Sequence, residues 1–247
     1  MLRRTGLEVA AAVVAGVVLG TGAHVLSADD GASTVAQLPA AQVAGRSVER
    51  VGAVADRVVE SSARSVLHVE ASGCGQDRQA SATLLRTDDG DVRLVTNAHV
   101  VRGTSSVTVR TRVGEQVQVD VLGVVAGRDA ALLDPEPLEQ HDDVEPAPVG
   151  SAMEVGDEVV LVGHPGAAFS VRPTLVEDVQ RRVAFGTASD VVLVGATVTG
   201  GASGGAVLDT RGAALGLVAA RDPGTGRAVA HPVDGVLDAA LRGELSC

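Results

Sequence analysis

Ser203 lies in a short run of small residues, Gly201-Ala202-Ser203-Gly204-Gly205. On a tight turn of this kind a serine can present its hydroxyl oxygen as a nucleophile. The backbone N–H groups of Gly201 and Ser203 can then point together at the oxyanion that forms during acyl transfer. Gly-rich turns between strands are also common without any catalytic role, so this segment alone leaves both interpretations open.

A histidine that could serve as a base occurs at the end of a predicted strand, in Thr96-Asn97-Ala98-His99-Val100. At a strand end the His99 side chain could face a cleft, although a single histidine is more often structural or solvent-exposed. Asn97 is the only Asn in a sequence that also lacks Lys, Ile, Tyr and Trp, a bias expected of a GC-rich genome. An Asn retained against that bias, two residues before His99, favours a functional interpretation of the segment.

Asp129 precedes an apolar strand in Gly127-Arg128-Asp129-Ala130-Ala131-Leu132-Leu133. A carboxylate there could be buried and accept a hydrogen bond from the Nδ1 of His99. By itself Asp129 would be interpreted as an ordinary residue of a surface turn.

The residues that could position these three groups follow a strand pattern. Short blocks that are apolar, alternating or β-branched are separated by turn signals at the spacing of an all-β sandwich or barrel. The first set of predicted strands is Ser65–Val69, Ala82–Arg86, Val92–Thr96, Ser106–Thr111, Gln116–Val125 and Ala130–Leu133. The second set is Asp157–Gly163, Ser170–Val176, Val191–Thr197, Gly204–Leu208, Ala213–Ala220 and Ala228–His231.

A Pro-rich and acidic linker, Asp134–Gly150, separates the two sets and predicts paired barrels with a cleft between them. We place barrel one at about 62–135 and barrel two at about 150–232, within a folded domain that spans 47–247. Helical spacing of valines predicts a short helix from Ser47 to Val59, and a second short helix is predicted at Val233–Leu241.

The acidic run Glu136–Glu145 could bind a cation, but we interpret it as a solvated loop and predict no metal site.

The composition restricts the class of protein. Hydrophobic residues make up 45% of the chain but aromatic residues only 1%, so the core must be aliphatic, which favours β-branched strands. The formal net charge of -11 and the absence of a basic cluster exclude nucleic acid as a partner, because phosphate binding depends on Lys and Arg.

The N-terminal segment predicts targeting or anchoring. Arg3 and Arg4 precede the charge-free stretch Val9–Ala23, and Leu7–Leu26 is long enough to span a membrane if Glu8 and His24 lie at the interfaces. We interpret 1–26 as a signal anchor, with a cleaved signal peptide as the alternative, and 27–46 as a flexible linker. Either interpretation puts the domain outside the cytoplasm, on the periplasmic or cell-wall side, as a single-pass membrane protein or a secreted one.

The order of the three motifs, TNAHV, then GRDAALL, then GASGG, resembles the trypsin-like (chymotrypsin-fold) serine proteases, especially their bacterial extracytoplasmic branch. The resemblance runs from about Ser65 to His231 and includes the turn Val162-Gly163-His164-Pro165-Gly166. It implies an all-β fold of two packed six-stranded antiparallel β-barrels. Only 44 residues follow Ser203, so we expect no appended PDZ domain of the kind found in Deg/HtrA proteases.

The resemblance also implies a mechanism. Ser203 would attack the scissile carbonyl, His99 would act as general base and then acid, and Asp129 would orient the imidazole. Gly201 and Ser203 would supply the oxyanion hole, and peptide bonds would be hydrolysed through an acyl-enzyme without a cofactor. Ala202 replaces the Asp that digestive members carry before the serine, so their activation by an ion pair with a new N-terminus is excluded.

The substrate pocket is predicted by counting from the motifs. Thr197 would lie at its base, with Ala219, Ala220 and Arg221 as its wall. A neutral base offers no partner for a basic P1 side chain, so small or apolar P1 residues of protein or peptide substrates are expected.

Cys74 and Cys247 are the only cysteines, and in an exported domain we predict that they form a disulfide. Free or intermolecular thiols are the alternative. The placement of the two cysteines is similar to that in actinobacterial membrane-anchored periplasmic proteases of the MarP type.

The alternative function, from another class, is a catalytically silent membrane-anchored binding module on the same fold.

Overall fold

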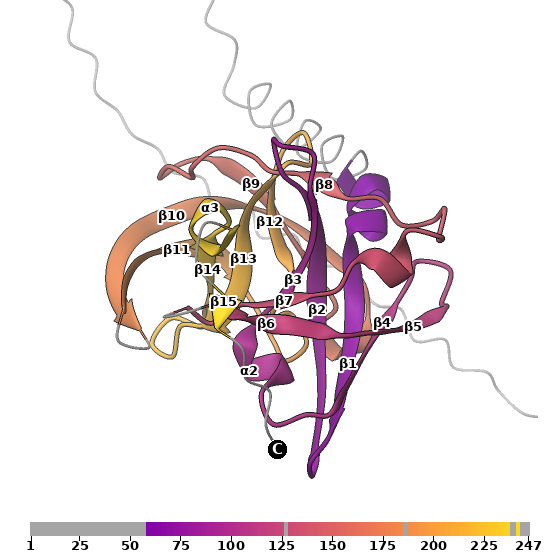
Figure 1. Ribbon diagram of the computed structural model, residues 1–247. Helices are drawn as coiled ribbons and strands as arrows, with labels where there is room; N and C mark the ends of the chain where they lie inside the picture. The colour runs from indigo at the N-terminus through magenta and orange to yellow at the C-terminus, as the bar shows by residue number, and fades with distance from the viewer. Residues whose placement is uncertain (1–57, 126–127, 185–186, 238–240, 243–247) are drawn as a thin grey trace, which may run out of the picture. The chain divides into compact units, whose positions relative to one another are not determined.

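The computed structural model describes residues 58–125, 128–184, 187–237 and 241–242, and these residues fold mainly as β-strands (Figure 1). Within this part of the chain, no helix is long and apolar enough to cross a membrane. The predicted membrane segment 7–26, the linker 27–46 and most of the predicted helix from Ser47 lie outside the described residues. Residues 58–65 are helical and lead directly into the first strand.

The first half of the described chain forms one curved sheet. Its strands run in the order β15-β6-β7-β3-β2-β1-β4-β5, with β8 paired in parallel to β2. The strands are β1 (Val66–Gly73), β2 (Gln76–Arg86), β3 (Val92–Thr96), β4 (Ser106–Arg110), β5 (Gln116–Val119), β6 (Val121–Val125), β7 (Ala131–Leu133), β8 (Ala147–Pro148) and β15 (Leu241–Arg242). Valine, leucine and alanine fill its core, as the aliphatic composition predicted.

This sheet differs from the predicted six-stranded barrel. The single strand predicted at Gln116–Val125 is interrupted at the exposed Asp120, so that β5 pairs with β4 whereas β6 pairs with β7. The bent chain therefore connects the edge strand β5 to β6, which lies next to the other edge strand, β15, and no ladder of hydrogen bonds closes the sheet among the described strands. Gly123, with a φ of 157° close to extended backbone, lies at a shift in the β6–β7 register.

The second half forms a closed barrel of six antiparallel strands, as predicted. The order around it is β10-β11-β14-β13-β12-β9. The strands are β9 (Glu158–Gly163), β10 (Ser170–Ala184), β11 (Thr187–Thr197), β12 (Ala206–Asp209), β13 (Ala214–Arg221) and β14 (Arg227–Pro232). The strands β10 and β11 extend well beyond their predicted ends because they pair with each other as a long hairpin.

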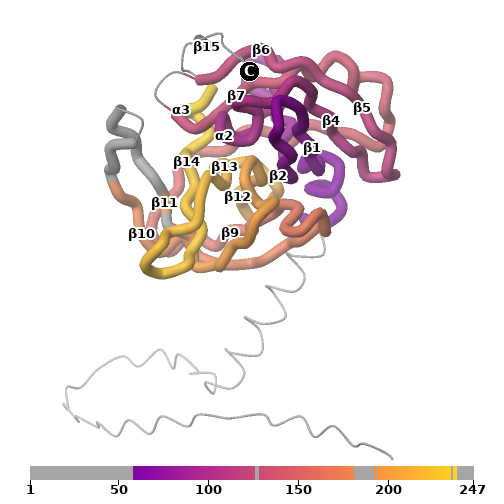
Figure 2. The backbone as a smooth tube through the Cα atoms, turned by 90° about the horizontal axis from the view of Figure 1, so that it is seen from below, coloured from indigo at the N-terminus to yellow at the C-terminus, as the bar shows by residue number. Residues whose placement is uncertain are grey.

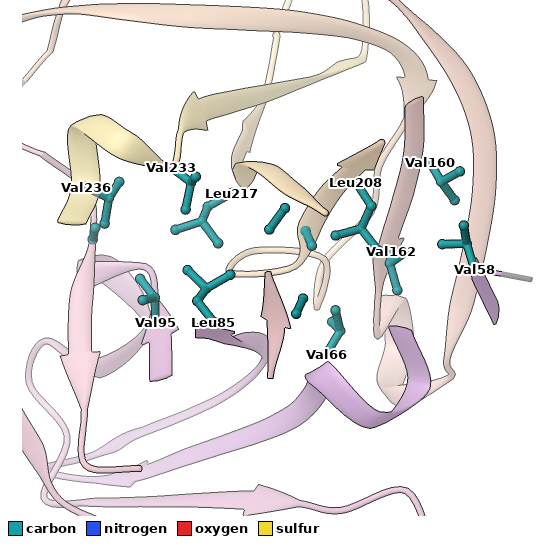
Figure 3. Packing of buried hydrophobic residues seen from close by; sticks show 14 of the residues in the cluster. Val58, Val66, Leu85, Val95, Val160, Val162, Leu208, Leu217, Val233 and Val236 are labelled. Atoms are coloured by element: carbon teal, nitrogen blue, oxygen red, sulfur yellow. The ribbon is translucent and has the colours of Figure 1, made fainter. Parts of the chain in front are cut away.

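A separate hydrophobic cluster packs between the curved sheet and the barrel. It combines Leu85 of β2 and Val95 of β3 with Leu208 of β12 and Leu217 of β13. In Figure 3, Leu85 and Leu217 point toward one another from the two halves. Figure 2 shows β1 and β2 beside β9, in agreement with their contacts. The cluster fixes the two halves against each other, so that side chains from both can meet at one site.

Two short helices correct the predicted elements. The segment after β3 is not simply a strand end, because α2 (Ala98–Val101) starts there and carries His99. The predicted helix Val233–Leu241 is only α3 (Asp234–Leu237), since Leu241 instead belongs to β15 and pairs with Val125 of β6. The linker Asp134–Gly150 contains the 3-10 turn η1 (Glu136–Leu138) and strand β8, both of which pack on the first sheet.

Candidate active site

The ladder between β3 and β7 brings His99 and Asp129 together. Thr96 pairs with Ala131 in this antiparallel ladder, so the chain just after β3 lies beside the chain just before β7. His99 Nδ1 lies 2.6 Å from Asp129 Oδ2, and the backbone N–H of His99 donates to Asp129 Oδ1 at 2.9 Å. Two bonds to two carboxylate oxygens fix the plane of the imidazole relative to the carboxylate.

Asp129 is buried, whereas the side chain of His99 is 46% exposed. Burial alone would raise the pKa of the Asp129 carboxyl, but the hydrogen bonds and charge of His99, with a smaller effect of His231, outweigh it and lower that pKa. Asp129 is therefore a carboxylate at neutral pH, next to a His99 side chain that is accessible to solvent.

Ser203 lies on a turn between β11 and β12, and we call residues 200–204 the Ser203 turn. Each of its carbonyl oxygens accepts a hydrogen bond from the protein. The donors are Gly166 N–H to Gly200, Ser81 Oγ to Gly201, Gly205 N–H to Ala202, Ser81 N–H to Ser203 and Thr83 Oγ1 to Gly204. In a trans peptide the N–H points away from the C=O. The bonds to the carbonyls of Gly200 and Ala202 therefore turn the N–H groups of Gly201 and Ser203 away from these protein donors.

The N–H groups of Gly201 and Ser203 donate no recorded hydrogen bond to any described residue. Two unused donors beside a serine hydroxyl are what an oxyanion site requires. Among the described residues no hydrogen bond links Ser203 Oγ with His99. In free enzymes such bonds are often long and form when substrate binds.

Gly201 has a φ of +98°, a conformation that L side chains rarely adopt. A Cβ at this position would also overlap the carbonyl oxygen of His164, at the start of the turn between β9 and β10. Glycine is thus required at Gly201 for two reasons. The segment Val162–Gly166, which the sequence singled out only as a resemblance, proves to pack directly against the Ser203 turn.

Ser81 and Thr83 were missed as site residues by the sequence interpretation. Ser81 is fully buried and contacts the Ser203 turn through both its backbone and its side chain. The available signal was two hydroxyl residues, Ser81 and Thr83, alternating with alanines in the apolar part of β2.

The residues predicted for the substrate pocket lie near each other at one end of the barrel. Thr197 pairs with Arg227 of β14, and Arg221 pairs with the next residue, Ala228. Ala219 is buried, whereas Ala220 and Arg221 are exposed. The carbonyl of Thr197 accepts a hydrogen bond from Arg172 at 3.2 Å.

A small cavity of about 10 Å³, room for about one water molecule, lies beside Thr197. Its lining residues are Leu161, Gly163, Pro165, Ser170, Arg172, Thr197, Val198, Thr199 and Ala202. None of Ala219, Ala220 and Arg221 lines it, so this cavity is not the predicted substrate pocket.

Two predicted features depend on the parts of the chain beyond the described residues. Cys74 is disulfide-bonded, but Cys247 lies outside the described residues, so their pairing stays a prediction. No group of three or more metal-ligating side chains that could hold a metal ion occurs in the described part of the chain.

Known proteins are similar to this chain in sequence and in fold. The putative serine protease HhoA of Synechocystis sp. is 33% identical over 147 residues, 57% of this chain and 37% of that protein. The serine protease Do-like HtrA of Lactococcus lactis subsp. lactis is 28% identical over 148 residues, 56% of this chain and 36% of that protein. The chain thus matches little more than a third of the length of these relatives.

The structure is similar to the active form of the Rv3671c protease from M. tuberculosis, with a TM-score of 0.66, 24% identity and coverage of 79% of this chain and 90% of that one. It is also similar to the HtrA-type protease AlgW with tripeptide, with a TM-score of 0.65, 21% identity and coverage of 74% and 61%. At such identities the likeness shows the fold alone. The trypsin-like peptidase domain matches residues 80–217, more than half of the chain, and this span contains His99, Asp129 and Ser203, so the chain belongs to the family of trypsin-like peptidase domains.

Proposed function

We propose that this protein is a serine endopeptidase in which Ser203 is the nucleophile, His99 the general base and acid, and Asp129 the group that orients His99. The observation that carries the proposal is the 2.6 Å contact between His99 Nδ1 and Asp129 Oδ2. A carboxylate in this position selects the tautomer that leaves Nε2 free to accept a proton. The relatives named serine proteases support the same reaction class.

In the proposed reaction, Ser203 Oγ forms a bond to the scissile carbonyl carbon while its proton passes to His99 Nε2. The carbonyl oxygen becomes negatively charged and accepts hydrogen bonds from the N–H groups of Gly201 and Ser203. The C–N bond then breaks, and the leaving amine takes the proton from His99. Water, deprotonated by His99, attacks the acyl-enzyme, and the proton returns to Ser203 as the acid product leaves.

Asp129 contributes by remaining charged. Because its pKa is lowered, it can stabilise the imidazolium that forms on His99 in each half of the reaction. Replacing Asp129 with Asn should retain the fold and reduce kcat by a factor on the order of 10⁴, because the amide favours the wrong imidazole tautomer.

The substrates are proposed to be proteins or peptides with a small or apolar P1 residue. Thr197 is neutral, and Ala219 and Ala220 have small side chains. Arg221 is exposed and available to an acidic substrate residue. Cleavage of a peptide library, read by mass spectrometry, tests the P1 preference, and a preference for Lys or Arg would contradict it.

We also propose that residues 7–26 anchor the protein in the membrane with the domain outside the cytoplasm.

The function is tested by digestion of a fluorescently labelled, unfolded protein such as casein with the full-length chain. We expect turnover by the wild type and background rates for Ser203→Ala, with both proteins folded by circular dichroism. Binding of casein without any Ser203-dependent cleavage between pH 5 and 8 would instead favour the silent binding module.

A further inference from the structure

Ser81, at the middle of β2, contacts the nucleophile segment of the other half of the molecule. Its backbone N–H donates to the carbonyl of Ser203 at 2.8 Å, and its hydroxyl donates to the carbonyl of Gly201 at 2.8 Å. The same hydroxyl accepts a hydrogen bond of 2.9 Å from the backbone N–H of His164. The Ser81 residue is completely buried, so these bonds do not compete with water.

We propose that Ser81 is a positioning residue that holds the oxyanion hole in its working conformation. This inference rests on the proposed function, in which the N–H groups of Gly201 and Ser203 bind the oxyanion. Each of these two residues carries one of the oxyanion donors on its N-terminal side. Ser81 binds the carbonyl on the C-terminal side of each, and so restrains the ψ angle of both.

Restraint is needed at this turn because Gly201 and Gly204 both have positive φ and lack side chains that would limit rotation. Without the bond to its carbonyl, the ψ angle of Gly201 could change with little steric cost. Because this bond of the backbone lies between the two donors, such a change would move the N–H of Ser203 relative to the N–H of Gly201. The catalytic advantage of an oxyanion hole depends on donors that are already in place before the charge develops.

The chemistry at Ser81 calls for a hydroxyl. The side chain lies between a donor, His164 N–H, and an acceptor, the carbonyl of Gly201, and a hydroxyl serves as acceptor and donor at once. Alanine would leave both buried groups unpaired. The space is limited on the remaining side, since a Cβ at Gly163 would lie 3.2 Å from the Ser81 oxygen.

Ser81 also connects the nucleophile to the strand that carries the base. Its carbonyl accepts a hydrogen bond of 2.7 Å from Thr96 Oγ1, and Thr96 ends β3 immediately before Asn97 and His99. The packing of β2 therefore sets the position of the Ser203 turn relative to the His99 segment. Thr83, two residues along β2, adds a bond of 2.9 Å to the carbonyl of Gly204.

The test compares the full-length wild type with Ser81→Ala and with Ser65→Ala. Ser65 is a matched control, because it is also a buried serine whose hydroxyl donates to backbone carbonyls, those of Ser61 and Ser62, away from the Ser203 turn. For Ser81→Ala we expect kcat to fall by about tenfold or more with KM changed less than about twofold. The affinity for a peptide boronate, which forms a tetrahedral adduct with the serine, should fall in parallel with kcat.

A merely structural role would give a different result. If Ser81→Ala lost activity only in proportion to its unfolded fraction, or kept the wild-type kcat and boronate affinity, the proposal would be overturned. Ser65→Ala should retain kcat, and an equal loss in both variants would also overturn it. If Ser81→Ala does not fold, Ser81→Cys preserves the shape with a weak donor, and a wild-type kcat in that variant would refute the role. Failure of the wild type itself to cleave any substrate would count against the proposed function and not against Ser81 specifically.

Discussion

The side-chain nitrogen of Asn97 donates a hydrogen bond of 2.6 Å to the backbone carbonyl of Asp129, and both residues are buried. This bond holds the loop before β7 against the end of β3, the two segments that carry Asp129 and His99. The only Asn in the sequence thus lies at the junction of the His99 and Asp129 segments.

We expect Asn97→Ala to lower the free energy of unfolding by about 1–3 kcal/mol, because the buried carbonyl of Asp129 loses its partner. The value of kcat should fall as well, since the carboxylate of Asp129 is less well placed. Urea unfolding and steady-state kinetics on the same preparation measure the two effects. A variant that is destabilised but has the wild-type kcat would show that Asn97 supports the fold only.

Gly201→Ala is expected to remove most of the activity, by a factor on the order of 10² or more, because it displaces a proposed oxyanion donor. The new Cβ would meet the carbonyl of His164 at a backbone φ of +98°. Gly200→Ala is the matched control, since a Cβ there meets no atom within 4 Å. Similar kinetic constants for the two variants would contradict the assigned geometry of the turn.

His164 should make the protein less stable in acid. Burial, with a smaller effect of His68, lowers the pKa of the His164 imidazole from 6.5 to about 4. Between these two values the unfolded chain binds a proton that the folded chain does not, so the free energy of unfolding falls as the pH falls from 6.5 to about 4. Because the ring is partly exposed, we expect a loss of about 1–2 kcal/mol.

The measurement is the urea midpoint at pH 7.5 and pH 4.5 for the wild type and His164→Gln. The variant should lose clearly less stability on acidification. The neighbouring ring is His68, whose centroid lies 5.6 Å from that of His164. The pKa of His68 is also lowered, because burial and the charge of Arg110 outweigh the opposite effect of Glu70. Equal losses in the wild type and His164→Gln would refute the assignment.

The predicted bond between Cys74 and Cys247 closes most of the domain into one loop. Its removal by Cys74→Ser or by a reductant should cost up to about 5 kcal/mol in the chain-entropy model. Thermal unfolding with and without dithiothreitol measures this cost. A reductant that lowers the Tm of Cys74→Ser as much as that of the wild type would exclude the disulfide as the cause.

Much of the fold could be predicted because an aliphatic, β-branched chain leaves a clear strand pattern. The strand Val92–Thr96 is predicted with its observed bounds, and most of the others agree within a few residues. The bend at Asp120 could not be predicted, because it depends on which neighbour each half of the strand pairs with, and pairing is a tertiary property. The same holds for Leu241, which forms a strand only because β6 offers it an edge.

His99, Asp129 and Ser203 could be proposed from their residue types and the order of their motifs, and the structure brings His99 and Asp129 together. The support that β2 gives to the Ser203 turn could not be predicted from the sequence. Ser81 is one of many serines, and its role depends on a contact with a carbonyl 120 residues away. The role of Asn97 was indicated by composition, but its bond to Asp129 required the structure.

The central claim, that Ser203 is an activated nucleophile, is tested most directly by reaction of the folded, full-length protein with a fluorophosphonate probe. After proteolytic digestion, mass spectrometry locates the adduct. We predict a single phosphonylated serine, Ser203, with labelling that is strongly slowed in His99→Ala and absent in Ser203→Ala. Folded wild-type protein that shows no Ser203-dependent labelling at any pH from 5 to 8 would contradict the account.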